Sequence, residues 1–346
     1  MRKNNPKYNG WKKRRSKLIW EREYKRKEKN KNSFTPPTRN NNVNYEGPDI
    51  EFFNLPNRFS IYDNFEEVTR NFNQIKKTIN SPSFNKKHIH FNMSSSELVR
   101  VDALMYLLTF IKNIRHMNEK IKMVGGNFPL NLECKEVVRE SGFLNYLNSM
   151  TKSTYSEENI QIMAGKDVDT DIFRKILHFT HKKLNCSRLD TKDLYTLFGE
   201  IIGNANEHAY DNDSFNGWNK YLIFANYIEN KVRFVILDTG EGIIKTMKKK
   251  FHEKLFPDDR ALLKSALKGE FRTATELKYR GNGLPTIRGM CAKGIVKNFS
   301  LITNSVVYRT SYANGKLSEK YESYMGMLEG TLYYFDFSLG GTNFEH

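Results

Sequence analysis

The sequence predicts an α/β protein in which a basic tail and a small α/β domain precede a two-layer α/β sandwich with a mostly antiparallel sheet. Apolar runs of strand length alternate with amphipathic helical patterns through most of the chain. The amino-terminal 32 residues are instead dominated by Lys and Arg. Later in the chain, two strand patterns are separated only by Glu229 and Asn230, a polar pair typical of a hairpin turn. We therefore expect a tail and linker over 1–45, a small domain over 46–150 and the sandwich over 151–346.

The length and composition limit the class of protein. A chain of 346 residues is long enough for about two domains and for a core that needs no disulfides. Its three cysteines have neither zinc spacing nor an even count, which favours buried reduced thiols. The longest apolar stretch, Ala103 to Ile111, is far shorter than a membrane span of about 20 residues, and no signal-type stretch follows the basic start. We expect a cytoplasmic protein with no membrane-spanning segment.

The tail combines positive charge with aromatic residues. Residues 1–32 hold 14 Lys or Arg against three Glu, a charge of +11 out of +17 for the whole chain. Trp11 and Trp20 lie among these basic residues, and Asn30 to Asn44 reads as a polar linker. Basic side chains neutralise phosphates and aromatic rings stack on bases, a mixture suited to nucleic-acid binding by residues 1–32. A solvated arm with no specific partner is favoured over nucleic acid, and an acidic protein partner and a membrane surface are further alternatives.

The small domain is predicted from a strand, helix, strand, helix order that begins near Tyr45. A strand over His88 to Phe91 is followed by a helix over Leu98 to Arg115 and a strand over Lys120 to Val124. A second helix closes at Gly142 to Leu144. This order predicts parallel strands joined by right-handed crossovers.

The sandwich begins with a strand over Asn159 to Ile162 and an amphipathic helix over Asp169 to Lys183. A second helix, around Glu200, follows it. We expect helices on one face of a sheet, and the remaining strands of that sheet are predicted over Tyr221–Ile228, Lys231–Leu237, Phe299–Thr303, Val306–Ser311 and Thr331–Phe337.

Three short motifs carry the chemistry, and the first is a helical one. Glu200 and Asn204 lie four residues apart, so they share one face of a helix. A carboxylate there can orient a water or accept a proton, and a carboxamide oxygen can bind Mg²⁺. The apolar positions of the same stretch form the opposite, core-facing stripe, and they are Leu194, Leu197, Phe198, Ile201, Ile202 and Ala205.

The second and third motifs are rich in glycine. Asp238-Thr-Gly240-Glu-Gly242 follows a buried strand, where the carboxylate can accept a hydrogen bond from an exocyclic amine. Gly281-Asn-Gly283 comes about 40 residues later, which leaves room for a mobile lid. Glycines let the backbone approach a purine and its phosphates closely. The flanking cations, Lys278 and Arg280, can offset phosphate charge.

Together the three motifs resemble those of the GHKL ATP-binding superfamily, which includes gyrase-type topoisomerases, a chaperone family, histidine kinases and mismatch-repair ATPases. The resemblance implies ATP and Mg²⁺ as cofactors. It implies that Asn204 binds the metal, Glu200 activates the attacking group and Asp238 binds the adenine amine. It implies that the loop from Gly281 to Gly283 wraps the triphosphate. In that superfamily a Gly-Thr pair late in the domain closes the adenine pocket. Gly330-Thr331 resembles this pair, and Gly341-Thr342 is an alternative candidate for it.

Two further resemblances narrow the branch. The first motif ends in Asn-Ala-Asn-Glu-His208, similar to the anti-sigma-factor serine kinases of the same superfamily. His208 itself is best explained by packing or capping of the helix end. Val101-Asp102-Ala103-Leu104 resembles STAS domains of anti-anti-sigma factors, with Ala103 at the position where those proteins carry a phosphorylated serine.

Three uses of the nucleotide site remain open. The first is a slow ATPase or a nucleotide-controlled switch that acts on a protein or nucleic-acid partner, and the absence of a phosphoacceptor at Ala103 favours it. The second is a serine/threonine kinase of the anti-sigma type, with Glu200 as the base. The third is a module that binds nucleotide without turnover. No candidate phosphoacceptor histidine precedes Asn204 in a dimerising helix pair, which argues against a conventional sensor histidine kinase.

Overall fold

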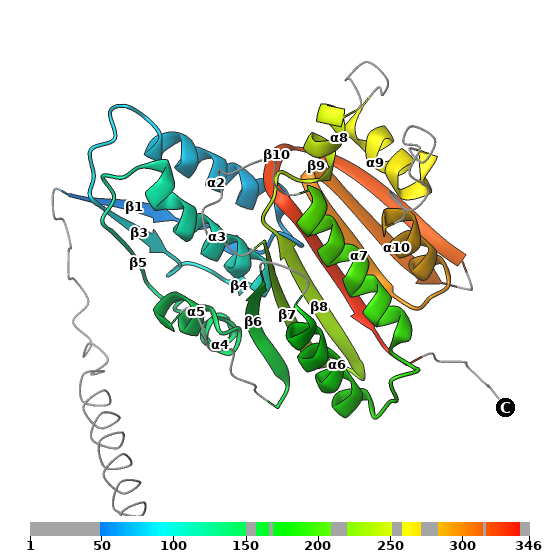
Figure 1. Ribbon diagram of the computed structural model, residues 1–346. Coiled ribbons are helices and arrows are strands. Elements are labelled where there is room, and N and C mark those ends of the chain that lie inside the picture. Colours follow the sequence, from blue (N-terminus) through cyan, green and yellow to red (C-terminus); the bar gives the residue numbers. More distant parts are fainter. Residues whose placement is uncertain are drawn as a thin grey trace, which may run out of the picture. The chain divides into compact units, whose positions relative to one another are not determined.

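The protein is an α/β protein, as the sequence predicts. Residues 48–346 form one compact unit. The domain boundary at residue 150 stays a prediction, and the tail over residues 1–32 lies outside the described residues. The computed structural model describes residues 49–149, 157–165, 169–208, 220–250, 258–270, 283–313 and 316–339 (Figure 1).

The amino-terminal part is built on three parallel strands in the order β1 (Ile50–Asn54), β3 (His88–Asn92) and β5 (Met123–Gly126). The helices α2 (Phe65–Ile79) and α3 (Val101–Met117) follow the first two strands in the chain. Parallel pairing and β3 agree with the prediction, whereas β1 and α2 were not predicted. The strand expected at Lys120 begins three residues later because a turn precedes it. In this turn the Asn118 side chain accepts a hydrogen bond from the Lys120 amide, and the Asn118 carbonyl accepts one from the Ile121 amide.

Two boundaries in this part differ from the prediction for local reasons. Helix α3 does not begin at Leu98, because Leu98–Val99 form the short strand β4, which pairs in parallel with β2 (Arg58–Phe59). The second predicted helix is two helices, α4 (Leu132–Glu140) and α5 (Phe143–Ser149), with Gly142 between them. Gly142 has a φ of +78°, and a Cβ there would lie 2.6 Å from Cβ of Gln161. Only glycine fits this left-handed junction without displacing its neighbour.

The large sheet has five strands, and every neighbouring pair is antiparallel. Its order is β6 (Asn159–Gly165), β7 (Tyr221–Ile228), β8 (Lys231–Asp238), β10 (Lys316–Phe337) and β9 (Lys297–Ala313). The two strands predicted over 299–303 and 306–311 are one strand, β9, which continues through Asn304 at a positive φ of 51°. Strand β10 begins at Lys316 rather than Thr331, and almost all residues of this first half are exposed or only partly buried.

One face of this sheet is covered by α6 (Thr170–Leu184), α7 (Lys192–His208) and α10 (Gly283–Ala292) (Figure 1). The helices α8 (Ile243–Lys250) and α9 (Asp259–Lys268) pack near β9. The apolar stripes predicted for α6 and α7 are buried in one cluster with inward-facing side chains of the strands. Helix packing on this face agrees with the prediction.

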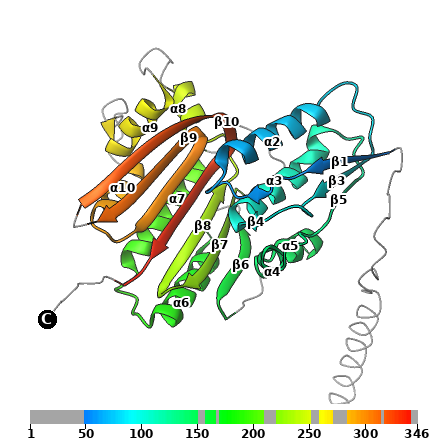
Figure 2. The same cartoon turned by 180° about the vertical axis from the view of Figure 1, so that it is seen from behind.

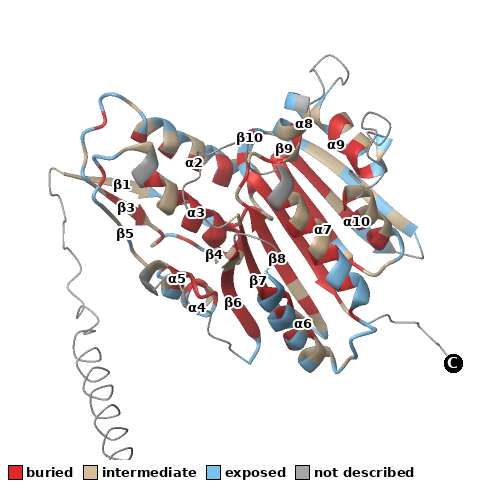
Figure 3. Cartoon of the chain, in the orientation of Figure 1, coloured by how far each residue is buried: buried red, intermediate tan, exposed pale blue. Residues whose placement is uncertain are grey.

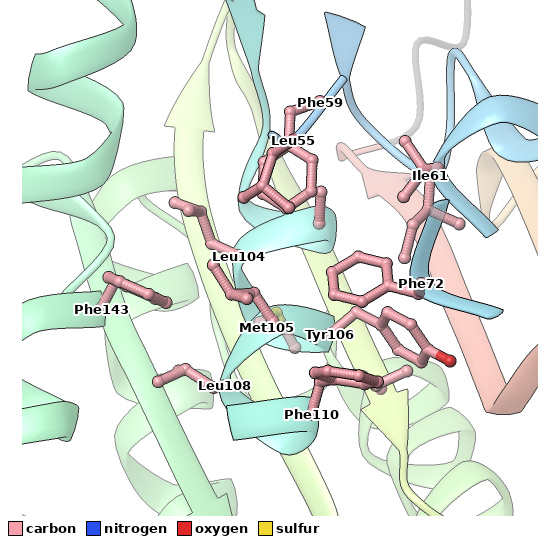
Figure 4. Close-up of a cluster of buried hydrophobic side chains, with 14 of the residues drawn as sticks. Leu55, Phe59, Ile61, Phe72, Leu104, Met105, Tyr106, Leu108, Phe110 and Phe143 are labelled. Atoms are coloured by element: carbon pink, nitrogen blue, oxygen red, sulfur yellow. The ribbon is translucent and has the colours of Figure 1, made fainter. Parts of the chain in front are cut away.

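The opposite face of the sheet is buried as well, which the sequence did not predict. Along β7, Tyr221 and Ile223 join the cluster under the helices, whereas Leu222 and Phe224 join a second cluster with residues of α2 and α3. Successive side chains of a strand point to opposite faces, so the sheet is the middle layer of three. Figure 2 shows α2 and α3 from the other side, and in Figure 3 the central strands are buried along much of their length. Figure 4 shows Leu104 and Leu108 of α3 within the second cluster.

Stacked rings and cations add to this packing at the carboxyl-terminal part of β10. The rings of Tyr62 and Tyr334 stack with centroids 4.3 Å apart. The Arg309 guanidinium lies 4.9 Å from the Tyr62 ring, and that of Arg233 lies 5.2 Å from the Tyr334 ring. Arg233 also makes a bidentate ion pair with Asp336. The loop before α2 is therefore joined to the sheet by polar as well as apolar contacts.

Candidate functional site

Helix α7 holds the first motif in the orientation that the sequence predicts. Its six apolar positions are all buried, and Phe198 meets Phe234 of β8 edge to face at 5.2 Å. Burial of this stripe fixes the rotation of the helix about its axis. Glu200 and Asn204 are consequently half-buried on the side of α7 that faces α10.

The third motif meets the first at Gly283, the first residue of α10. A Cβ on Gly283 would lie 3.0 Å from Oε2 of Glu200 and 3.1 Å from Nδ2 of Asn204. The absence of a side chain therefore lets the start of α10 reach both polar groups. The first amides of a helix have no partner within that helix, so this junction combines N–H donors, a carboxylate and a carboxamide.

Asp238 stands at the end of β8, opposite Thr331 of β10. It is only 7% exposed, and its Oδ1 accepts a hydrogen bond of 2.6 Å from the Gly240 amide. Burial raises the pKa of Asp238 to about 6, although hydrogen bonds from the Gly240 amide and the Thr331 hydroxyl oppose this rise. A carboxylate held in this way presents a hydrogen-bond acceptor at the end of a central strand.

Gly330-Thr331 is the Gly-Thr pair that lies beside Asp238. Gly330 has a φ of +96°, and a Cβ there would lie 2.0 Å from the Asp238 carbonyl oxygen. A side chain at this position would therefore force the two strands apart. The competing pair, Gly341-Thr342, lies outside the described residues.

Gly242 has a structural explanation. It begins the turn into α8 with a φ of +89°, and a Cβ would lie 2.6 Å from the Asn304 side chain. Asn304 Nδ2 donates to the Glu241 carbonyl at 2.8 Å, and its Oδ1 accepts from the Lys245 amide at 3.1 Å. Gly242 therefore makes room for the side chain that holds this turn, and Gly240 holds the carboxylate of Asp238.

Tyr333 lies at this site and was missed by the sequence prediction. It is two residues after Thr331 on β10, so its side chain points to the same face of the sheet. It is fully buried, and its hydroxyl oxygen has no accessible surface. Burial, and then the negative charge of Asp238, raise its pKa, and a hydrogen bond with the Asn204 side chain lowers it. Its spacing from Thr331 was the signal that could have identified it.

The segment that leads into Gly330-Thr331 contacts the amino-terminal part. The Glu329 amide donates to the Tyr106 hydroxyl of α3 at 3.5 Å, and the Glu329 side chain pairs with Lys76 of α2. Asn73 Nδ2 donates to the Met327 carbonyl at 3.4 Å. One strand thus connects the surroundings of Asp238 with α2 and α3.

Asp102 and Ala103, at the start of α3, lie in the same packed layer. Ala103 is fully buried, and Asp102 is 1% exposed. The Asp102 carboxylate accepts hydrogen bonds from the Tyr62 amide at 2.6 Å and from the Ala103 amide at 2.8 Å. Burial raises the pKa of Asp102 to about 6 despite these two donors and the charge of Arg100.

Four predicted site features cannot be placed. Lys278, Arg280 and Gly281 lie outside the described residues, and so does the side chain of His208. Within the described ranges, no three His, Cys, Asp or Glu side chains gather as a metal site. A magnesium ion held mainly by one carboxamide and by phosphate oxygens needs no such group.

The residues that can be placed fit a bound magnesium nucleotide in one respect. Gly283 leaves a space beside Glu200 and Asn204 that a Cβ would fill.

Comparison with known proteins identifies no family for this chain. Neither a scan of protein-family models nor a search of curated proteins finds a match to the chain. Across the residues that the structure describes, none of the helices has both the length and the apolar character needed to cross a membrane.

Proposed function

We propose that the chain is a Mg²⁺-dependent ATP-binding protein whose carboxyl-terminal part is a GHKL-type domain. The observation that carries the proposal is the contact of Gly283 with Glu200 and Asn204. Two motifs about 80 residues apart in the chain meet there at a helix start, where backbone amides favour anions. The buried Asp238 and its neighbour Thr331 lie across the same helix-covered face of the sheet.

Each residue then has one role. Asn204 supplies an oxygen ligand to the metal, Asp238 accepts the hydrogen bond of the adenine amine, and Gly283 leaves room for phosphate. Bound Mg²⁺ would neutralise phosphate charge and orient the terminal phosphoryl group. Glu200, half-buried beside the phosphate end, is positioned to take a proton from an attacking hydroxyl.

We further propose that the nucleotide acts as a switch with slow hydrolysis. The contacts of Glu329 with α2 and α3 support this use, because this residue directly precedes Gly330-Thr331. A nucleotide that shifts Thr331 would also shift the layer behind the sheet, where Asp102 lies. The same observation favours the switch over the kinase, because the STAS-like layer is already packed against the sheet and Ala103 is buried.

Nucleotide specificity tests the proposal. Asp238→Asn presents an amide in place of a pure acceptor, so ATP affinity should fall by about 10-fold or more and discrimination against GTP should weaken. Asp336→Asn is the matched control, because Asp336 is also a buried aspartate of the same sheet and its partner is Arg233. This control should lose stability and keep its ATP affinity. Wild-type protein that binds no ATP at millimolar concentration would overturn the proposal.

A further inference from the structure

The carboxylate of Glu319, in the first half of β10, accepts several hydrogen bonds at once. Arg288 of α10 donates to it in a bidentate contact, with Nε 2.9 Å from Oε1 and Nη2 2.7 Å from Oε2. The Tyr308 hydroxyl of β9 donates to Oε1 at 2.7 Å, and the Tyr321 hydroxyl donates to the same oxygen at 3.4 Å. The hydrogen bond from Arg288 holds the pKa of Glu319 below its ordinary value. A bidentate pair fixes the relative orientation of its two planar groups, which a single contact between exposed charges does not do.

Both strands of the β9–β10 hairpin hold Glu319 in place. Tyr308 and Tyr321 are opposite each other in the strand register, and their ring centroids are 4.7 Å apart. Tyr308 is fully buried, and Tyr321 packs against the cluster under the helices. The Glu319 side chain is only 21% exposed. The ion pair therefore joins α10 to a well-packed part of the hairpin.

Helix α10 has few other contacts that set its rotation about its own axis. It lies beside α7 and the hairpin (Figure 1). Three of its side chains are buried, whereas α7 buries a stripe of six, and the three are Ile287, Met290 and Cys291. A Cα lies about 2.3 Å from the axis of a helix, so a rotation of about 10° would move it by about 0.4 Å. Gly283 tolerates little such movement, because its Cβ position is 3.0 Å from Oε2 of Glu200.

We propose that Arg288 and Glu319 are positioning residues for the nucleotide site, whose ion pair sets the rotation of α10 and thereby the place of Gly283 beside Glu200 and Asn204. The inference rests on the proposed nucleotide site. It also gives the hairpin control over that site. A partner that moves the first half of β10 would move Glu319, and the start of α10 would follow.

Loss of either member of the pair should weaken nucleotide binding to a similar extent. Glu319→Gln keeps the shape of the side chain but turns an amide group toward the guanidinium, and Arg288→Gln removes the guanidinium itself. Affinity for Mg·ATP should fall by about 5-fold in each variant, and the double variant should lose no more than either one, because the two residues act as a unit. If Arg288 bound phosphate directly, Arg288→Gln alone would lose affinity.

Arg233→Gln is the matched control. Arg233 makes a bidentate contact of the same kind with Asp336, but this pair joins β8 to β10 within the sheet. The variant should lower the free energy of unfolding and leave affinity for Mg·ATP unchanged. A general loosening of the fold would instead lower the affinity of all these variants alike.

Titration calorimetry with Mg·ATP, together with urea unfolding, tests the assignment on the full-length wild type and these variants. A further protein combines Glu319→Gln with Gly283→Ala. Because the pair acts through Gly283, Glu319→Gln should change affinity much less once a methyl group occupies that position.

The proposal is overturned if either single variant binds Mg·ATP as wild type does, or if the two losses add in the double variant. It is also overturned if Arg233→Gln loses the same affinity, or if Glu319→Gln has its full effect in the presence of Gly283→Ala. Wild type that binds no ATP is a separate result, which refutes the nucleotide site itself and this inference with it.

Discussion

Alanine at Gly283 isolates the contact on which the candidate site depends. The added Cβ would lie 3.0 Å from Oε2 of Glu200 and 3.1 and 3.2 Å from the two polar atoms of the Asn204 amide. Ordinary contacts of a methyl group are about 3.5–4 Å, so both side chains would have to retreat by several tenths of an ångström. That retreat moves the proposed base and the proposed metal ligand together.

Gly289 provides the matched control for this substitution. It lies on the same helix, and a Cβ there would meet no atom within 4 Å. Exchange of a helical glycine for alanine stabilises by about 1 kcal/mol when nothing obstructs the methyl group. We therefore expect Gly289→Ala to raise the free energy of unfolding by up to about 1 kcal/mol and to leave ATP binding unchanged. Gly283→Ala should gain less, because the crowding at Glu200 and Asn204 offsets the helical gain.

Urea unfolding and titration calorimetry on the two variants separate stability from binding. Gly283→Ala should bind Mg·ATP at least about 10-fold more weakly than wild type, because the methyl group fills the space proposed for phosphate. The two variants differ by position alone, so a general effect of alanine on the helix would appear in both. The reasoning is refuted if Gly283→Ala binds Mg·ATP as tightly as Gly289→Ala does.

Three further outcomes are expected. Glu200→Gln should lower ATP turnover by about 100-fold with little change in ATP binding. The control Glu229→Gln, at an exposed turn, should change neither. Equal phosphate release by Glu200→Gln and wild type would place the base elsewhere. Because burial raises the pKa of Asp102 to about 6, the folded state keeps a proton that the unfolded state has lost, so the stability of wild type falls as pH rises from about 4 to 6. The free energy of unfolding of Asp102→Asn relative to that of wild type should therefore rise by about 2–3 kcal/mol across this range. A pH-independent difference between the two proteins would refute this reasoning. Deletion of residues 1–32 should abolish a salt-sensitive affinity for nucleic acid, measured by anisotropy at increasing salt, and leave ATP binding intact; no binding by the full chain at low salt would remove nucleic acid as a partner.

Local patterns in the sequence predicted the elements that present the site. Strands β7 and β8 are apolar runs on either side of Glu229-Asn230, and both turn residues adopt the positive φ that a tight hairpin requires. The helix carrying Glu200 was likewise evident from its apolar period. The positions of Asp238 and Asn204 could be predicted from these elements, because one lies at the end of β8 and the other on the polar face of α7.

What the sequence did not predict depends on contacts between distant segments. The first half of β10 has no fully buried residue until near its end, so it lacks the apolar alternation that marks a strand packed on a core. The burial of the second sheet face follows from contacts of α2 with β10 and of α3 with β8, strands that are more than 100 residues away in the chain. Tyr333 looked like one more aromatic residue in a strand, and only its position beside Asp238 and Asn204 places it at the site.

The central claim is that Asn204 binds Mg²⁺ in a complex with ATP, and calorimetry with and without the metal tests it most directly. Wild type should bind ATP more tightly with Mg²⁺ than with a chelator, since the metal bridges protein and phosphate oxygens. Asn204→Ala should lose most of that difference, while Thr196→Ala, an exposed change on the same helix, should retain it. An Asn204→Ala protein with the same Mg²⁺-dependent affinity as wild type would contradict the account.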